Sequence, residues 1–165
     1  ALAAEASGQT LSDYLARGEL LVHGTTHAIN AIVTGSTART AFLTSAGHPD
    51  TLVIREGGRM EPFNFTVAYP ETYIPRELTF EIPERITVNG AIKTPLDEDA
   101  TRAILEKLNS QNIEAIGVCF LWSVVNPAHE RRLGALIEEM LPGVPYTLSH
   151  KINPSIREYR RAIST

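Results

Sequence analysis

Residues 20–30, LLVHGTTHAIN, decide the architecture that the sequence predicts. Three apolar residues run into a His-Gly-Thr-Thr turn, and an apolar pattern with helical spacing follows until Gly35. Residues 39–45, RTAFLTS, then read as another buried strand. A strand, a helix and a second strand in this order favour a parallel sheet, whose ligands collect beyond the carboxyl ends of its strands.

The turn at the start of the helix has the features of an anion site. The first N–H groups of a helix lack partners inside the helix, Gly24 permits close approach, and the hydroxyls of Thr25 and Thr26 add donors. Candidate catalytic residues are therefore His23, Thr25 and Thr26, and the candidate cofactor or phosphate site is Gly24 with both threonines. The alternative is that a threonine only caps the helix and His23 only ends the strand.

A metal site at the same place is not expected. His23 and His27 have the spacing of a two-histidine helical motif, but Gly24 and the threonines place His23 before the helix. No glutamate lies between the two histidines. We therefore do not expect His23 and His27 to share a bound metal ion.

The rest of the chain continues the alternation of helices and strands. Residues 78–96 alternate apolar and polar side chains around Pro83 and contain Asn89-Gly90, which predicts an antiparallel hairpin with Pro83 at a bulge or edge. Residues 59–78 read as a surface excursion. The predicted fold is α/β, a mostly parallel sheet with flanking helices plus an antiparallel hairpin insertion, in one domain spanning residues 1–165. Further helices are expected within 10–18, 48–58, 95–112, 126–141 and 154–165, and further strands within 114–121 and 145–150.

Composition narrows the partners and the compartment. A chain of 165 residues with 43% hydrophobic residues can bury one sizeable core. A net charge of −4 argues against binding to nucleic acid or anionic lipid, and no apolar run is long enough to cross a bilayer. The single cysteine, Cys119, lies in an apolar run and cannot form an internal disulfide, so we expect a core residue and a reducing cytoplasm.

Two further segments carry candidate substrate-binding residues. His48 follows a predicted strand and could lie at the same sheet edge as His23, although Pro49 and Asp50 also suit a simple turn. Residues 55–59, REGGR, could clamp a carboxylate or phosphate through Arg55, Gly57, Gly58 and Arg59, or could form a solvated helix end. We interpret the NPAHE segment at 126–130 as structural, and the REYRR segment at 157–161 as a solvated helix face.

Three motifs resemble one known family over most of the chain. They are His-Gly-Thr-Thr with Asn30, the Asn-Pro-x-His-Glu segment at 126–130, and the Ile-Arg-Glu-Tyr-x-Arg segment that runs into Ser-Thr at 156–165. These motifs resemble the N-terminal region of the hydantoinase A, 5-oxoprolinase and acetone or acetophenone carboxylase subunit family. The resemblance adds Asn30 to the substrate-binding candidates.

The resemblance implies a fold related to the actin-like ATPases and a use of ATP with Mg²⁺ to activate an amide or ketone oxygen. It implies an ATP-dependent cyclic-amide hydrolase that phosphorylates the substrate carbonyl oxygen and associates with a hydantoinase B-type subunit or domain. The alternatives are a subunit of an acetone or acetophenone type carboxylase, and a non-catalytic scaffold domain. The family's Asp-x-Gly-Gly-Thr phosphate loop and second lobe are not in these 165 residues, so we expect a fragment that lacks ATP-dependent activity alone.

Overall fold

The structure, a computed structural model, describes residues 5–17, 26–57, 61 and 63–165. The chain divides into two compact units, Ala1–Ser36 and Thr37–Thr165, and each unit is described by itself. The strand expected at the start of the quoted stretch lies outside the described residues.

The first unit contains two helices that the sequence predicts. Helix α2 (Leu11–Ala16) begins after Thr10, whose hydroxyl accepts a hydrogen bond from the backbone N–H of Asp13 at 3.2 Å. Helix α3 (His27–Thr34) begins after Thr26 and ends at Gly35, which has a left-handed φ of 66°. Both helices confirm the sequence prediction.

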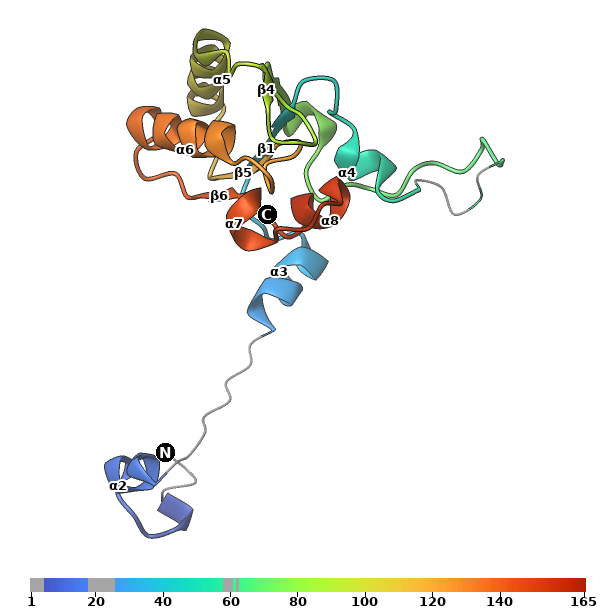
Figure 1. The fold of residues 1–165 in the computed structure, drawn as a ribbon. Coiled ribbons are helices and arrows are strands. Elements are labelled where there is room, and N and C mark those ends of the chain that lie inside the picture. The colour runs from blue at the N-terminus through green and yellow to red at the C-terminus, as the bar shows by residue number, and fades with distance from the viewer. Residues whose placement is uncertain (1–4, 18–25, 58–60, 62) are drawn as a thin grey trace. The chain divides into compact units, whose positions relative to one another are not determined.

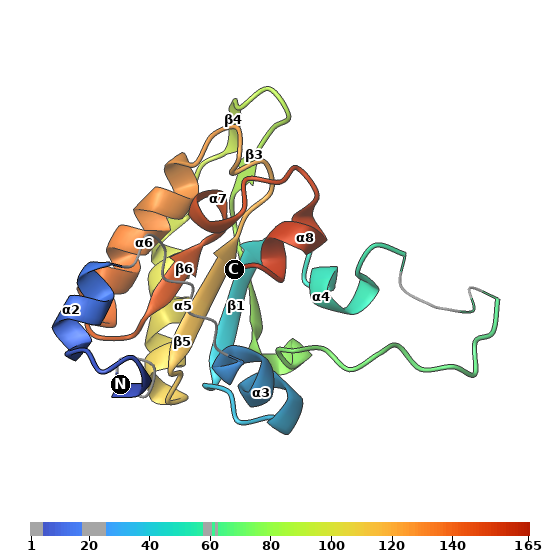
Figure 2. The ribbon, with the colours of Figure 1, turned by 90° about the horizontal axis from the view of Figure 1, so that it is seen from below.

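The second unit is built on a four-stranded parallel sheet with strand order β2-β1-β5-β6. Helices α5 and α6 cover one face of this sheet, and helices α4 and α8 cover the other (Figure 2). The predicted α/β fold with a parallel sheet is confirmed. The strands are β1 (Thr40–Ser45), β2 (Thr79–Ile82), β5 (Ala115–Cys119) and β6 (Tyr146–Leu148), and the helices are α4 (Thr51–Ile54), α5 (Glu98–Ser110), α6 (Ala128–Met140), α7 (Ser149–Ile152) and α8 (Glu158–Ala162).

The predicted hairpin is present, but it is shorter than expected. Strands β3 (Arg85–Ile86) and β4 (Ile92–Thr94) pair antiparallel, and Gly90 in their turn has a φ of 82°. Residues before Pro83 instead form β2, which pairs parallel with β1 in the main sheet. The difference arises because Phe80 and Ile82 bury their side chains in the core beside α5, and Pro83, which has no N–H, separates the two sheets.

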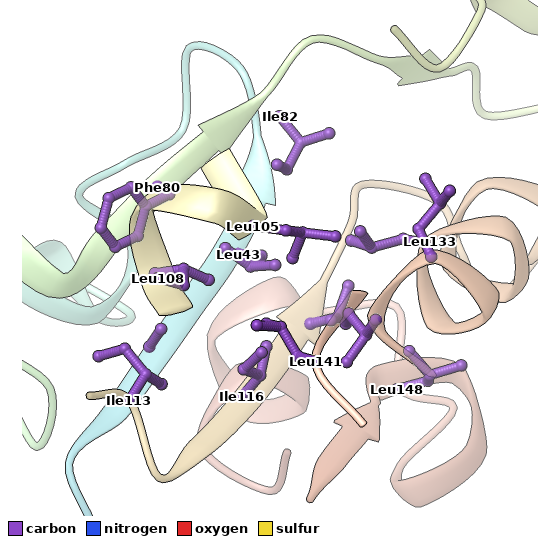
Figure 3. Packing of buried hydrophobic residues seen from close by; sticks show 14 of the residues in the cluster. Leu43, Phe80, Ile82, Leu105, Leu108, Ile113, Ile116, Leu133, Leu141 and Leu148 are labelled. Atoms are coloured by element: carbon purple, nitrogen blue, oxygen red, sulfur yellow. The ribbon is translucent and has the colours of Figure 1, made fainter. Parts of the chain in front are cut away.

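The main core lies between the sheet and helices α5 and α6 (Figure 3). Successive strand residues point to opposite faces, so Leu43 faces α5 and α6 whereas Phe42 packs with Leu52 and Ala162 on the other face. In α5 the buried face holds Thr101 and Leu105, whereas Ala103 is exposed. Other core members are Ile116, Val118, Leu108, Leu133, Leu136 and Ile137.

The segment between α4 and η1 (Arg76–Leu78) runs away from the sheet (Figure 1). Its aromatic side chains are open to solvent, with Phe63 91% and Tyr73 67% exposed. It is tied back to the body near its end, where the Nε atom of Arg76 lies 3.0 Å from a carboxylate oxygen of Asp50. The described residues of this segment therefore lie at the surface, as the sequence predicted. No helix among the described parts of the chain has the length and apolar character needed to span a bilayer.

The core makes a simple stability prediction. Leu136→Ala removes a side chain that is 0% exposed between α6 and the sheet, and we expect the free energy of unfolding to fall by about 3 kcal/mol. Urea unfolding followed by circular dichroism measures this change. Val88→Ala, at a residue that is 64% exposed, is the matched control and should change the free energy by less than about 0.5 kcal/mol. Equal effects of the two substitutions would contradict the packing described here.

Candidate functional site

A pocket of about 530 Å³ opens at the carboxyl ends of β1 and β5. The chain leaves β1 toward β2 on one side and leaves β5 toward β6 on the other, so the crevice between these two strands is the switch point where α/β proteins bind ligands. The segment that follows β1 lines one side of the pocket, and Leu121 and Trp122, which follow β5, line another. The pocket therefore lies beyond the carboxyl ends of two parallel strands, where ligands of α/β proteins collect.

The pocket wall combines apolar, aromatic and charged side chains. Trp122, Tyr159 and Ile54 supply apolar surface, whereas Arg55 and Arg85 supply guanidinium groups. The remaining lining residues are Gly47, His48, Pro49, Asp50, Thr51, Leu121 and Glu158. A cavity of this size, lined by both apolar and polar side chains, can hold a small molecule.

Contacts from β3 fix His48 in the wall. The Nη1 atom of Arg85 lies 3.2 Å from Nε2 of His48, and Nη2 of Arg85 donates to the carbonyl oxygen of Ala46 at 3.1 Å. A guanidinium group can only donate, so Nε2 of His48 accepts and the ring proton is on Nδ1. Before His48, Gly47 has a φ of 86° and donates its N–H to the carboxylate of Glu81 at 2.6 Å. The turn after β1 is therefore held in a single conformation.

Backbone strain is concentrated at this pocket. Among the described residues, three that are not glycine have a positive φ, namely Arg55 at 57°, Trp122 at 58° and Asn112 at 52°. Arg55 and Trp122 both line the pocket. The Nη2 atom of Arg55 donates to the carbonyl oxygen of Glu71 at 2.9 Å, but its Nε is buried without a hydrogen-bond partner among the described residues. Strain and an unpaired donor at one place are typical of a ligand site.

Behind the pocket, a chain of buried polar groups links four segments. The hydroxyl of Ser45 donates to Glu84 and accepts the backbone N–H of Leu121 at 2.9 Å. The other carboxylate oxygen of Glu84 lies 2.7 Å from Nδ1 of His129. The carboxylate stands between the serine and the histidine, so no imidazole is placed to take the serine proton. This group of residues therefore has a positioning geometry and not that of a nucleophile with its base.

A second buried group is centred on Glu130, which is 0% exposed. One carboxylate oxygen accepts from the N–H of Phe120 at 2.9 Å and from the hydroxyl of Ser149 at 2.6 Å. The other accepts from the N–H of His150 at 3.1 Å and lies 2.6 Å from Nδ1 of the same ring. Four contacts saturate the carboxylate, which is the condition for burying a charge.

The guanidinium group of Arg161 completes this second group. It is 0% exposed and donates to the hydroxyl of Ser149 at 3.1 Å and to the carbonyl oxygen of Phe120 at 2.9 Å. The interpretation of residues 157–161 as a solvated helix face is therefore wrong at this residue. Arg160, its neighbour, does face solvent and pairs with Glu56 at 2.7 Å, and this hydrogen bond holds the pKa of Glu56 below its usual value.

The Asn-Pro-Ala-His-Glu segment joins the hairpin to the ends of β5 and β6. Asn126 donates to the carbonyl oxygen of Gly90 in the hairpin turn at 2.8 Å. His129 contacts Glu84, and Glu130 binds residues after both strands. These contacts support the interpretation of the segment as structural.

Cys119 lies on the face of β5 that packs against Leu52 and Ala162 and is 3% exposed. Burial raises the pKa of its thiol to about 11. A thiol that stays protonated at neutral pH is a poor nucleophile, so Cys119 is a core residue, as the sequence indicated.

The described structure brings together two of the predicted site residues, His48 and Arg55. His23, Gly24, Thr25, Gly58 and Arg59 lie outside the described residues. Thr26 is exposed, and its hydroxyl makes no capping hydrogen bond but lies 3.4 Å from the amide nitrogen of Asn30, whose side chain is also exposed. Gly57 is exposed and lies outside the lining of the pocket.

Among the pocket residues that sequence reasoning missed are Arg85, Trp122, Glu158 and Tyr159. Glu158 and Tyr159 belong to a recognised motif, so they could have been proposed from the sequence. Arg85 and Trp122 gave no local signal, because their role depends on strand order. Within the described ranges, no three histidine, cysteine, aspartate or glutamate side chains converge as metal ligands.

Comparison with known proteins gives a consistent result. The family described as Hydantoinase/oxoprolinase N-terminal region matches residues 3–141. Caprolactamase subunit alpha of Pseudomonas jessenii is 35% identical over 164 residues, which is 98% of this chain and 24% of the relative. The acetophenone carboxylase gamma subunit of Aromatoleum aromaticum is 32% identical over 170 residues, which is 95% of this chain and 23% of the relative.

Solved structures extend the comparison to the fold. The crystal structure of ATP-dependent caprolactamase from Pseudomonas jessenii matches with a TM-score of 0.81 and 35% identity, covering 96% of this chain and 23% of that one. The nucleotide-free structure of acetone carboxylase also matches with a TM-score of 0.81, at 23% identity, over 98% of this chain and 24% of that one. The second match concerns the fold alone. The chain spans about a quarter of the length of these relatives.

The saturated carboxylate of Glu130 predicts a large effect of an isosteric change. Glu130→Gln replaces an acceptor by an NH₂ group that faces donors and leaves Arg161 without its nearby anion, so we expect a loss of about 3 kcal/mol in the free energy of unfolding. Urea unfolding measures it. Glu106→Gln, at an exposed position of α5, should be neutral. A loss of less than about 1 kcal/mol for Glu130→Gln would mean that the group contributes little to folding.

The buried thiol makes a second prediction. Because the pKa of Cys119 is raised to about 11, we expect an aromatic disulfide reagent at pH 8 to label the native chain at least about 100-fold more slowly than the chain in 8 M urea. Absorbance of the released thiolate measures the rate, and glutathione is the control for the reagent. Comparable rates in the two states would show that the thiol is accessible in the native protein.

Proposed function

We propose, from the premise that this chain belongs to the hydantoinase/oxoprolinase N-terminal region family, that it is part of an ATP-dependent enzyme that hydrolyses a cyclic amide. The observation that carries this proposal is the 35% identity to caprolactamase subunit alpha over 98% of the chain. That relative's solved structure is described as an ATP-dependent caprolactamase.

The pocket suits the organic substrate. Its aromatic and aliphatic wall fits the body of a small ring, and the guanidinium groups of Arg55 and Arg85 in the wall fit a carbonyl oxygen or the negative charge that develops on it. His48, held by Arg85, presents a ring of fixed orientation beside it. We assign substrate binding to Arg55 and His48, with Asn30, Gly57, Gly58 and Arg59 as further candidates.

ATP with Mg²⁺ would supply a phosphoryl group that activates the carbonyl oxygen of the amide, whose resonance otherwise makes it a weak electrophile. The donors of the pocket fit such chemistry, because two guanidinium groups lie in its wall. We assign the phosphate-binding role to Gly24, Thr25 and Thr26, with His23 beside them, since the N–H groups at the start of α3 suit an anion.

We further propose that the enzyme is a hetero-oligomer with a hydantoinase B-type subunit. Two relatives, the caprolactamase alpha chain and the acetophenone carboxylase gamma chain, are named as subunits. The second candidate function is ketone carboxylation, which the 32% identity to the acetophenone carboxylase gamma subunit favours. A non-catalytic scaffold is the remaining alternative.

The test is an assay of the full-length protein with its partner subunit. Caprolactam, hydantoin and 5-oxoproline are supplied with Mg-ATP, and acetone and acetophenone with Mg-ATP and bicarbonate, while product formation and phosphate release are measured. We expect substrate-dependent phosphate release with at least one cyclic amide. Activity with the ketones alone would favour carboxylation. If none of the compounds causes phosphate release, both enzymatic functions are contradicted.

A variant in the pocket makes the assay specific. Arg55→Ala should lower kcat/KM by roughly 10-fold to 100-fold, because it removes a charged hydrogen-bond donor from the pocket. Arg102→Ala, which breaks a surface ion pair with Glu139 on the far face of the sheet, is the control and should leave kcat/KM unchanged. Equal kcat/KM for Arg55→Ala and wild type would remove Arg55 from the substrate site.

A further inference from the structure

We propose that Trp122 is the residue that selects ring-shaped substrates, and that the buried Ser45–Glu84–His129 chain holds it in a strained backbone conformation for this purpose. The substrate class, cyclic amides or aryl ketones with a flat apolar face, rests on the proposed function. The positioning of the indole rests on the geometry of the described residues.

The backbone of Trp122 is the first line of evidence. Its φ of 58° lies in the left-handed region, which a bulky side chain seldom adopts. Such a conformation persists only where the surrounding structure fixes it. Three described residues other than glycine have a positive φ. Trp122 and Arg55 line the pocket, whereas Asn112 lies in the turn after α5.

The neighbours of Trp122 explain why it must turn. On one side, the N–H of Leu121 donates to the buried hydroxyl of Ser45 at 2.9 Å. On the other side, Ser123 is 1% exposed and its hydroxyl lies 3.2 Å from that of Ser149. The carbonyl oxygen of Trp122 accepts from the N–H of Val125 at 2.9 Å. Both flanking residues are buried, whereas Trp122 is half-buried and presents its side chain to the pocket beside Leu121.

The buried chain fixes the position of the Ser45 hydroxyl. Ser45 donates to Glu84, and Glu84 in turn lies 2.7 Å from Nδ1 of His129. Ser45 is 0% exposed and Glu84 is 3% exposed, so a hydroxyl without its carboxylate would lack a water to replace it. The next residue, Arg85, holds His48 on the opposite wall. One short segment, Glu84 and Arg85, thus positions both sides of the pocket.

The chemistry of the wall defines what it recognises. Trp122 with Tyr159, Ile54 and Leu121 provides flat apolar surface, while Arg55 and His48 provide polar contacts. An aromatic face favours a compact ring over a flexible chain, because both bury apolar area on it but the ring loses less conformational freedom when it binds. We infer that a ring next to the reacting carbonyl packs on the indole and that linear amides bind poorly.

Kinetics of the full-length enzyme with its partner subunit test the role of the indole, using caprolactam and linear hexanamide as probes. For Trp122→Gly we expect KM for caprolactam to rise about 10-fold with kcat within about 3-fold, because the lost contact binds the ground state and the transition state alike. We expect hexanamide to inhibit the wild type only weakly, and to inhibit Trp122→Gly to the same extent. Trp122→Phe should keep KM within about 3-fold.

Asn112→Gly is the matched control, because it relieves the same left-handed strain away from the pocket and should leave KM unchanged. A KM for Trp122→Gly within about 2-fold of wild type, with a urea midpoint that shows a folded protein, would overturn the proposal.

A double-mutant cycle tests the positioning chain. Ser45→Ala should raise KM several-fold in the wild-type background but have no further effect in Trp122→Gly, because glycine adopts a positive φ without support. Additive effects of the two substitutions would show that Ser45 does not act through Trp122.

Fluorescence separates this proposal from the proposed function. Trp122 is the single tryptophan of these 165 residues, so the part of the ligand-dependent emission that Trp122→Phe abolishes reports the pocket. The first informative outcome is a saturable change in emission on titration with caprolactam, none with hexanamide, and no ATP-dependent turnover. This outcome would support the role of Trp122 and reject the enzymatic function. The opposite outcome is turnover of caprolactam with an unchanged emission and an unchanged KM for Trp122→Gly. It would support the enzymatic function and reject the role of Trp122.

Discussion

The structure of the second unit depends on the burial of Glu130 with all its acceptor positions filled. Its carboxylate ties the start of α6 to Phe120 after β5 and to Ser149 and His150 after β6. Arg161 supplies the compensating charge through Ser149 and through the carbonyl oxygen of Phe120. A carboxylate in the interior must have such partners, so the segments that provide them are held together at the carboxyl edge of the sheet.

This constraint explains why the sheet edge can form a pocket. The chain after β5 is fixed by Glu130 at Phe120 and by Ser45 at Leu121, so the next residue, Trp122, is directed to the wall of the cavity. The same edge carries His48 and Arg55 from the segment after β1. Polar groups that pack the interior therefore also set the shape of the site, and a substitution in either group is expected to affect both stability and substrate binding.

Family membership and pocket geometry answer different questions. Similarity to the caprolactamase alpha subunit and to the acetophenone carboxylase gamma subunit supports a role in carbonyl chemistry, and the pocket supports a small ring as the organic substrate. The pocket lies at the carboxyl edge of the sheet. The His-Gly-Thr-Thr turn keeps its role as the proposed phosphate site on sequence grounds, because only Thr26 of that turn falls within the described residues.

The sequence by itself determined local elements: the helix within residues 10–18, the end of α3 at Gly35, the Asn89-Gly90 turn and the helices within 95–112 and 126–141. These features depend on neighbours within a few residues, so the local pattern reveals them. Only the tertiary structure decided that residues 79–82 join the parallel sheet, that Arg161 is buried, and that Arg85 and Trp122 meet His48 at one pocket. Their partners lie tens of residues away in the chain, and strand order, which no local periodicity encodes, brings them together.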